Sequence, residues 1–147
     1  MAAMMTEAPG ASAAQVKAPG QGDTPRLAMP AVLLVSPDVQ ALQVMKSSLD
    51  RAGFEVDTAL CPDVALRLYA ESAHEAIVID EGIGSFALCR DVLARPRRVA
   101  PCVLLVSGAD EHAAPLPDGV ERLEKPLSLR YLVGRLTGQF GYFPLSV

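Results

Sequence analysis

Continuous apolar runs recur along the chain, and segments of a different periodicity separate them. Residues 31–35, 76–79 and 102–106 are apolar throughout. Such runs are typical of strands buried on both faces of a parallel sheet. Residues 54–58 instead alternate apolar and polar side chains, as an edge strand with one open face does. Residues 120–123 form a weaker fifth run. The pattern therefore predicts five strands.

The segments between these runs have helical spacing. The first is capped by Asp38, runs to Ala52 and is followed by Gly53, a residue type common just after a helix end. A second helix is expected to begin at Pro62, because proline suits the first helical turn. A third ends before Pro96. A closing helix is outlined by apolar residues spaced three and four apart. These are Leu129, Leu132, Val133 and Leu136.

The alternation of strands and helices predicts parallel βαβ units and a doubly wound, three-layer α/β domain. One further helix is expected between the fourth and fifth strands, over residues 109–118. Pro115 and Pro117 fall inside it, and interior prolines remove backbone hydrogen bonds and clash with the preceding turn. We therefore expect this fourth helix to be shortened or absent.

The two ends of the chain differ in composition from the middle. Residues 1–28 are rich in Ala, Gly, Pro and Ser without periodicity, which predicts a disordered tail, and they lack the basic and apolar regions of a secretory signal. Met5 and Met29 are alternative candidate starts. Residues 29–138 form the predicted domain. Residues 139–147 form an aromatic tail that either docks on the domain or binds a partner.

The length, hydropathy and net charge of the chain exclude several classes of protein. The 147 residues suffice for one domain with its own core. No apolar run approaches the length of about 20 residues that spans a membrane. A net charge of −4 argues against a binder of nucleic-acid phosphates, which needs a basic excess. We expect a cytoplasmic protein with neither a membrane nor a nucleic acid as its partner.

The cysteines and histidines do not form a recognisable site. Cys61, Cys89 and Cys102 are odd in number and far apart, which favours free thiols in a reducing compartment. His74 and His112 have no ligand-type residue at metal-binding spacing, so we expect no metal site on them.

Four arginines gather around the end of the third helix. Two interpretations are open: a patch that binds an anion or a nucleic acid, or a solvated helix end where cations suit the helix dipole. The second is favoured. The four are Arg90, Arg95, Arg97 and Arg98.

Three side chains that could take part in a reaction follow successive apolar strands. Asp80, Ser107 and Lys125 each lie at a predicted carboxyl end, and in a doubly wound sheet these ends meet at one crevice. A carboxylate can attack phosphorus, a hydroxyl can bond a phosphoryl oxygen, and an ammonium can offset the added charge. The three together predict a site for phosphoryl transfer, although an Asp80–Lys125 ion pair with a Ser107 hydrogen bond would also hold the strand ends together without chemistry.

At this point the sequence resembles the receiver domain of bacterial two-component response regulators. The resemblance covers roughly residues 30–138. It is carried by residues 32–35, 53–56, 76–80, 105–108 and 123–126.

The resemblance implies the flavodoxin-like strand order 2-1-3-4-5. It also implies that Asp80 is the phosphoacceptor for a histidine kinase, that Ser107 is the switch hydroxyl and that Lys125 faces the phosphate.

The sequence departs from the family where the metal would bind. Receivers carry an acidic pair after the first strand, which holds Mg²⁺ together with the phosphoacceptor, and here those positions are Ser36 and Pro37. Magnesium prefers several hard oxygen ligands, and proline has no side-chain oxygen. Asp38 could join Asp80 as a metal ligand only in a shifted loop, so its role as an N-cap is favoured.

A second departure concerns the switch. The aromatic residue that receivers place before the lysine is Arg122 here. A guanidinium cannot be buried without a partner at low cost. We therefore expect Arg122 to point outward and to leave Ser107 uncoupled from the output face.

These features predict a degenerate receiver: a stand-alone signalling protein, not an enzyme, that acts through protein–protein interaction with impaired phosphotransfer. Its partners would be signalling proteins, among them a histidine kinase, and it would need no cofactor. The alternative is a phosphorylation-competent single-domain regulator with a relocated magnesium site. A haloacid-type phosphatase is disfavoured, because its motif needs a second aspartate where this chain has Gly82.

Overall fold

A five-stranded parallel sheet with the order β2-β1-β3-β4-β5 forms the centre of the molecule. The computed structural model describes residues 29–82, 84–108 and 115–140. The strands are β1 (Ala31–Val35), β2 (Glu55–Ala59), β3 (Ala76–Asp80), β4 (Cys102–Ser107) and β5 (Val120–Glu124). The predicted fold class and strand order are confirmed, and the alternating run lies at one edge of the sheet, as β2.

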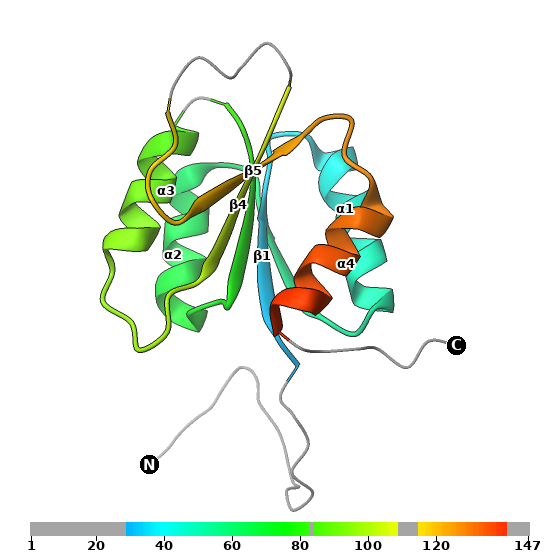
Figure 1. Cartoon of the computed structure of the whole chain (residues 1–147), viewed down its shortest axis with the longest axis horizontal. Coiled ribbons are helices and arrows are strands. Elements are labelled where there is room, and N and C mark those ends of the chain that lie inside the picture. The colour runs from blue at the N-terminus through cyan, green and yellow to red at the C-terminus, as the bar shows by residue number, and fades with distance from the viewer. Residues whose placement is uncertain (1–28, 83, 109–114, 141–147) are drawn as a thin grey trace, which may run out of the picture.

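Helices cover both faces of this sheet. Figure 1 shows α1 and α4 on one face and α2 and α3 on the other. The helices are α1 (Val39–Arg51), α2 (Pro62–Ser72), α3 (Ser85–Ala94) and α4 (Leu129–Phe140). Asp38 caps α1 and Pro62 opens α2, both as predicted. The molecule therefore has the three layers expected from the alternation of strands and helices.

Two hydrophobic clusters, one on each side of the sheet, explain why the central strands are apolar throughout. Successive side chains of a strand point to opposite faces. In β1, Val32 and Leu34 belong to the cluster under α1 and α4, whereas Leu33 and Val35 belong to the cluster under α2 and α3. All four are buried. A strand covered on both faces has no solvent-exposed position at which a polar residue would be favoured.

The region between β4 and β5 differs from the other crossovers. The described residues 115–119 carry no helix, and the rest of the predicted fourth helix, residues 109–114, lies outside the described residues. At the end of the chain, α4 continues two residues beyond the predicted boundary, and Phe140 packs edge-on against Phe54, with 6.5 Å between the ring centroids. The first aromatic residue of the predicted tail therefore docks on the domain, whereas residues 1–28 and 141–147 are not described.

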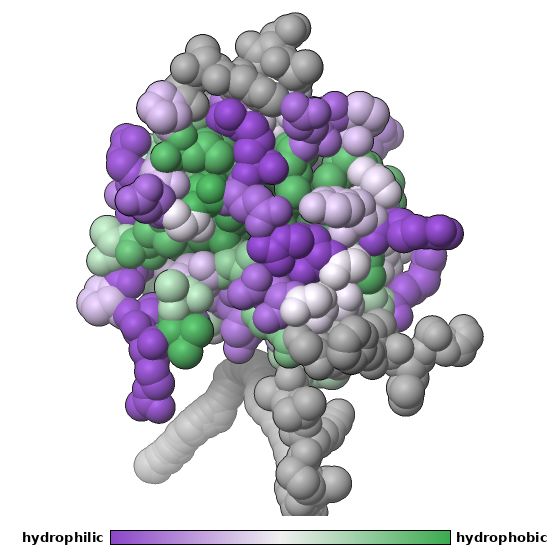
Figure 2. Space-filling model, viewed as in Figure 1, coloured by the Kyte–Doolittle hydropathy of each residue, from purple (hydrophilic) through white to green (hydrophobic). Residues whose placement is uncertain are grey.

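The edge strand β5 is charged and tied to α4. On the face shown in Figure 2, hydrophilic residues run down the middle, where β5 lies. Charged side chains on an edge strand oppose pairing with other chains. Arg135 of α4 donates hydrogen bonds from Nε to both carboxylate oxygens of Glu121, at 3.0 and 3.2 Å. The hydrogen bonds from Arg135 hold the pKa of Glu121 below its usual range.

A pH-dependent contribution to stability follows from this lowered pKa. Because the folded pKa of Glu121 is depressed, its contribution should be present above the ordinary glutamate pKa and lost as the pH falls below that value. Glu121→Gln should therefore lower the free energy of unfolding at pH 7 by no more than about 1 kcal/mol, since the pair is partly exposed. Urea unfolding at neutral and acidic pH measures both effects.

The matched control is Glu55→Gln, which removes an exposed carboxylate from the other edge strand. It should change the unfolding midpoint little at either pH. A loss for Glu121→Gln that is equally large at acidic pH would show that the ion pair is not its source.

The favoured interpretation of the four arginines as a solvated helix end is wrong for Arg97, whose guanidinium is bound within the protein. Its Nη1 donates to the hydroxyl of Tyr69 and to the carbonyl of His74, both at 2.7 Å. Its Nη2 donates to the carbonyl of Ala73 at 3.0 Å. The guanidinium also lies 5.3 Å from the centroid of the Tyr69 ring. Arg97 therefore clamps the connection after α3 to the end of α2.

The clamp covers a buried histidine. His74 is 1% exposed, stacks on Tyr69 with ring centroids 6.3 Å apart, and places Nε2 2.8 Å from a carboxylate oxygen of Asp57. The bond to Asp57 and the stacking on Tyr69 give this histidine a structural role at the sheet end opposite Asp80.

All three cysteines are free thiols, as predicted. Burial raises the pKa of Cys89 to about 11 and also raises the pKa of Cys102. A thiol of high pKa is a poor nucleophile at neutral pH. No helix in the described part of the chain has the length and apolar character needed to cross a membrane.

Candidate functional site

Parallel pairing brings Asp80 and Lys125 together at the carboxyl ends of the strands. Asp80 is the last residue of β3, and Lys125 directly follows β5. The Lys125 ammonium lies 2.7 Å from Oδ1 of Asp80. Between them, β4 ends at Ser107. The sequence predicted that these three positions would converge, and the structure places Asp80 and Lys125 in direct contact.

The second carboxylate oxygen of Asp80 is bound by a residue that the sequence analysis did not include in the site. Ser36 directly follows β1, is fully buried, and donates a hydrogen bond from Oγ to Oδ2 of Asp80 at 2.9 Å. The same Oγ accepts a hydrogen bond from the backbone N–H of Asp38 at 3.1 Å. Because β1 and β3 are neighbours in the sheet, a polar residue just after β1 could have been recognised as a partner for Asp80.

Ser107 does not make the hydrogen bond that the sequence suggested. Its hydroxyl is buried and has no hydrogen-bond partner among the described residues. In the strand register Asp80 pairs with Val106, so the side chain of Ser107, one residue on, alternates to the opposite face. The hydrogen bond to the carboxylate comes from Ser36 instead.

Arg122 also departs from the expectation that it points outward. The residue is half-buried, and its Nε and Nη2 are buried without a hydrogen-bond partner in the described part of the chain. The neighbouring Leu123 belongs to the cluster under α1 and α4, so alternation directs Arg122 toward the face of α2 and α3. The position of Arg122 in β5 directs its side chain toward the covered face of the sheet, and this outweighs the preference of the guanidinium for water.

Asp38 acts as the cap of α1. Its Oδ1 accepts hydrogen bonds from the backbone N–H groups of Gln40 and Ala41, at 3.0 and 3.2 Å. Within residues 29–82, 84–108 and 115–140, no group of three or more His, Cys, Asp or Glu side chains could hold a metal ion. The capping role, which the sequence favoured, is therefore the one that the structure shows.

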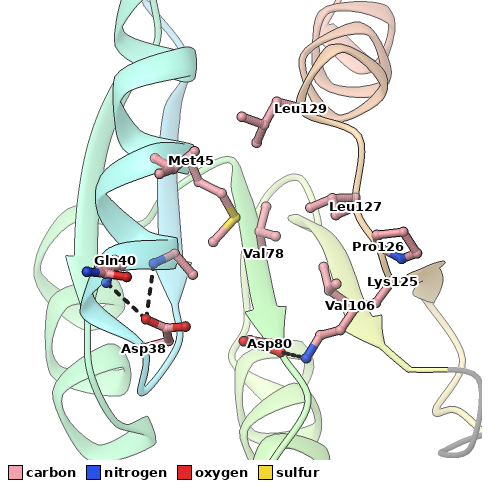
Figure 3. Close-up of a pocket in the computed structure, with 12 residues that line it drawn as sticks. Asp38, Gln40, Met45, Val78, Asp80, Val106, Lys125, Pro126, Leu127 and Leu129 are labelled. Carbon is pink, nitrogen blue, oxygen red and sulfur yellow. Dashed lines mark hydrogen bonds and ion pairs between the residues drawn. The ribbon is translucent and has the colours of Figure 1, made fainter.

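Asp80 borders two hollows. The larger has a volume of about 790 Å³ and lies between α1 and the start of α4. Figure 3 shows Asp38 and the Asp80–Lys125 pair at one end of it and Met45, Leu127 and Leu129 toward the other. The smaller, about 280 Å³, lies on the side of the loop after β1. The Asp80 side chain is 18% exposed, although its Oδ1 is buried.

The chemistry open to this site is limited by how Asp80 is held. A carboxylate beside an ammonium could attack a phosphoryl group, and the ammonium could offset part of the added charge. One oxygen of Asp80 is paired with Lys125 and the other accepts the Ser36 hydrogen bond. Each contact withdraws electron density from the oxygen that it binds and so lowers the nucleophilicity of the carboxylate.

No family model matches the chain. The chain is 35% identical over 115 residues to the transcriptional regulatory protein PrrA of Mycobacterium leprae and equally to that of Mycobacterium tuberculosis. The match covers 73% of this chain and 48% of the relative, so the chain spans about half the length of these curated relatives.

Solved structures with the same fold are receiver domains. The response regulator receiver domain (CheY-like) from Methylobacillus flagellatus has a TM-score of 0.66 at 24% identity, with 76% of this chain and 98% of that chain covered. A putative response regulator from Chloroflexus aurantiacus has a TM-score of 0.66 at 22% identity, over 78% and 99%. The receiver domain of the hybrid histidine kinase CckA has a TM-score of 0.59 at 25% identity, over 74% and 97%.

Proposed function

Because the chain carries a receiver domain of the response-regulator family, we propose that it is a signalling protein that acts through protein–protein contacts, with impaired phosphotransfer to Asp80. It is a degenerate receiver and not an enzyme. Its partners are other signalling proteins, a histidine kinase among them, in the cytoplasm.

The observation that carries this proposal is the Ser36 hydrogen bond. In receivers an acidic side chain at this position helps to hold Mg²⁺. Here a neutral hydroxyl contacts Asp80 at 2.9 Å, while Lys125 contacts the other oxygen at 2.7 Å. Both carboxylate oxygens thus have partners within the protein, which supports a site that does not rely on a metal ion.

The residues around Asp80 do not fit a magnesium ion well. Magnesium requires near-octahedral oxygen coordination, yet Pro37 has no side-chain oxygen, and one carboxylate oxygen of Asp38 is occupied as the α1 cap. Losing the cation that neutralises phosphoryl charge costs several kcal/mol of transition-state stabilisation. About 1.4 kcal/mol corresponds to a tenfold change in rate. The proposed phosphotransfer at Asp80 is accordingly slow.

Nucleic acid is not proposed as a partner of this chain. Its net charge is −4, and binding to phosphates depends on a basic excess. The curated relatives are named as transcriptional regulatory proteins, but they are about twice as long as the matched region.

A second candidate function follows from the exposure of Asp80. The carboxylate borders two hollows and is reachable from solvent, and Lys125 is in place to offset phosphoryl charge. These features favour a phosphorylation-competent regulator in which Asp80 is the phosphoacceptor and Asp38 leaves its cap to join a relocated magnesium site.

Partner binding separates the two candidates. If the protein acts through contacts of its surface with partner proteins, Asp80→Ala should change the amount of partner protein that it captures from the native cell by no more than about twofold. Tyr131→Ala, which removes a 53% exposed aromatic from α4, should reduce capture severalfold, because exposed aromatics often anchor interfaces. Quantitative affinity purification with mass spectrometry measures both.

The control is Tyr131→Phe, which keeps the ring and should bind as the parent does. Loss of capture by Asp80→Ala, with the protein folded and abundant, would contradict the proposal and favour signalling through the carboxylate.

A further inference from the structure

The cavity between α1 and α4 has the size and lining of a small-molecule site. Its volume of about 790 Å³ falls within the range of roughly 300–1,000 Å³ found for ligand pockets. Such pockets are mostly apolar, with a few polar groups that orient the ligand. This cavity is also mostly apolar, and its charged side chains lie together at one end, where they could orient a ligand.

The body of the cavity is apolar and partly open. Met45 of α1 lines one wall, Leu127 and Leu129 line the opposite wall, and Val78 of β3 lies between them (Figure 3). Val44 of α1 also lines the cavity. Val44 remains 53% exposed although it is apolar. Burying such surface under an alkyl or aromatic group is favourable because it removes apolar area from water.

The polar end carries an uncompensated negative charge. Lys125 and Asp80 form an ion pair there and largely offset each other. Asp38 lies at the same end (Figure 3), and its contacts are hydrogen bonds to backbone N–H groups, which neutralise only part of its charge. No described cation lies within ion-pair distance of Asp38. The formal charges lining the cavity therefore sum to −1.

From this arrangement we propose that the cavity binds a small amphipathic molecule with an apolar body and a cationic head group, such as a primary ammonium. The apolar body lies between α1 and the start of α4, and the head group contacts the Asp38 carboxylate. The bound molecule also contacts the Asp80–Lys125 pair. Binding in the cavity does not depend on whether Asp80 can be phosphorylated.

The test is an NMR titration of the full-length, ¹⁵N-labelled chain with three probes that share one tail: octylammonium, octanoate and 1-octanol. Concentrations stay below those at which the probes self-associate. Octylammonium should bind most tightly, with saturable shifts at Val44, Met45 and Leu127. Tighter binding of octanoate, saturable shifts confined to other regions, or the absence of saturable binding would each overturn the proposal.

Asp38→Asn isolates the charge, because asparagine caps a helix about as well as aspartate does. It should weaken octylammonium binding by about two- to fivefold, as expected for a partly exposed ion pair, and leave 1-octanol unchanged. The matched control is Asp63→Asn, which removes an exposed carboxylate from the first turn of α2, outside the cavity. Equal octylammonium affinities for Asp38→Asn and the parent would overturn the assignment of the head group.

A second variant tests the apolar body separately. Ala41 lines the cavity from α1, and Ala41→Leu adds bulk to its wall. It should weaken binding of all three probes severalfold without changing their order. Undiminished binding by a folded Ala41→Leu protein would place the probes elsewhere.

Discussion

Replacing both Ser36 and Pro37 by aspartate is expected to raise the rate of Asp80 phosphorylation by a small acyl phosphate at least about 100-fold, in a magnesium-dependent manner. The substitutions supply two hard oxygen ligands beside Asp80 and remove the Ser36 hydrogen bond that stabilises its carboxylate. A cation at that place contributes several kcal/mol to the transition state, and each 1.4 kcal/mol or so corresponds to a factor of ten.

Mass spectrometry of the intact protein, incubated with acetyl phosphate with and without Mg²⁺, measures this rate. Calorimetry should show a submillimolar dissociation constant for Mg²⁺ in the double variant and much weaker binding in the parent. The control is Ser36→Ala with Pro37→Ala, which removes the same groups and adds no carboxylate. It should not become magnesium-dependent.

A single variant guards against loss of the fold in the double variant. Ser36 is fully buried, so a charged replacement could destabilise the fold in the absence of metal. Pro37→Asp alone alters an exposed position and should give a smaller but still magnesium-dependent gain. Fast, magnesium-dependent phosphorylation of the parent, lost in Asp80→Asn, would contradict the reading of this chain as a degenerate receiver.

Arg97→Ala is expected to lower the free energy of unfolding by about 3 kcal/mol. The substitution removes three hydrogen bonds from a charged donor, a class of bond with a net worth of up to about 1.5–3 kcal/mol each. Their sum is discounted because Arg97 is only half-buried and Ala73 is exposed, so that water replaces part of what is lost. It also leaves the hydroxyl of Tyr69, a residue only 2% exposed, without its donor. For a domain of this size such a loss lowers the melting temperature by roughly 10 °C or more.

Urea unfolding followed by circular dichroism measures the change. Arg98→Ala is the matched control, because Arg98 is adjacent and exposed, and such substitutions usually stay within about 0.5 kcal/mol. Arg97→Lys keeps the charge but cannot span the three acceptors, so its loss should be intermediate. Equal unfolding midpoints for Arg97→Ala and Arg98→Ala would show that the clamp does not stabilise the domain.

The sequence by itself determined the fold because burial is encoded locally. Runs such as residues 76–79 have no polar position, and this is stable in water only for a strand covered on both faces. Periodicity then predicted the helices, and the N-cap Asp38 and the first-turn proline Pro62 predicted where two of them begin. The position of Asp80 at a carboxyl strand end, and hence its nearness to Lys125, followed from the parallel topology.

Only the tertiary structure decided which side chains pair at the site. Ser36 and Asp80 are 44 residues apart in sequence, and their contact depends on the register of β1 against β3. The same holds for Arg97, which reaches back to α2 and could not be distinguished by spacing from the exposed arginines beside it. For Arg122 and Ser107, strand alternation and coverage by neighbouring elements outweighed the usual preference of a polar group for water or a partner. Local patterns determine which face of an element is buried, but hydrogen bonds across the sheet depend on register and rotamer, which arise only when distant segments pack together.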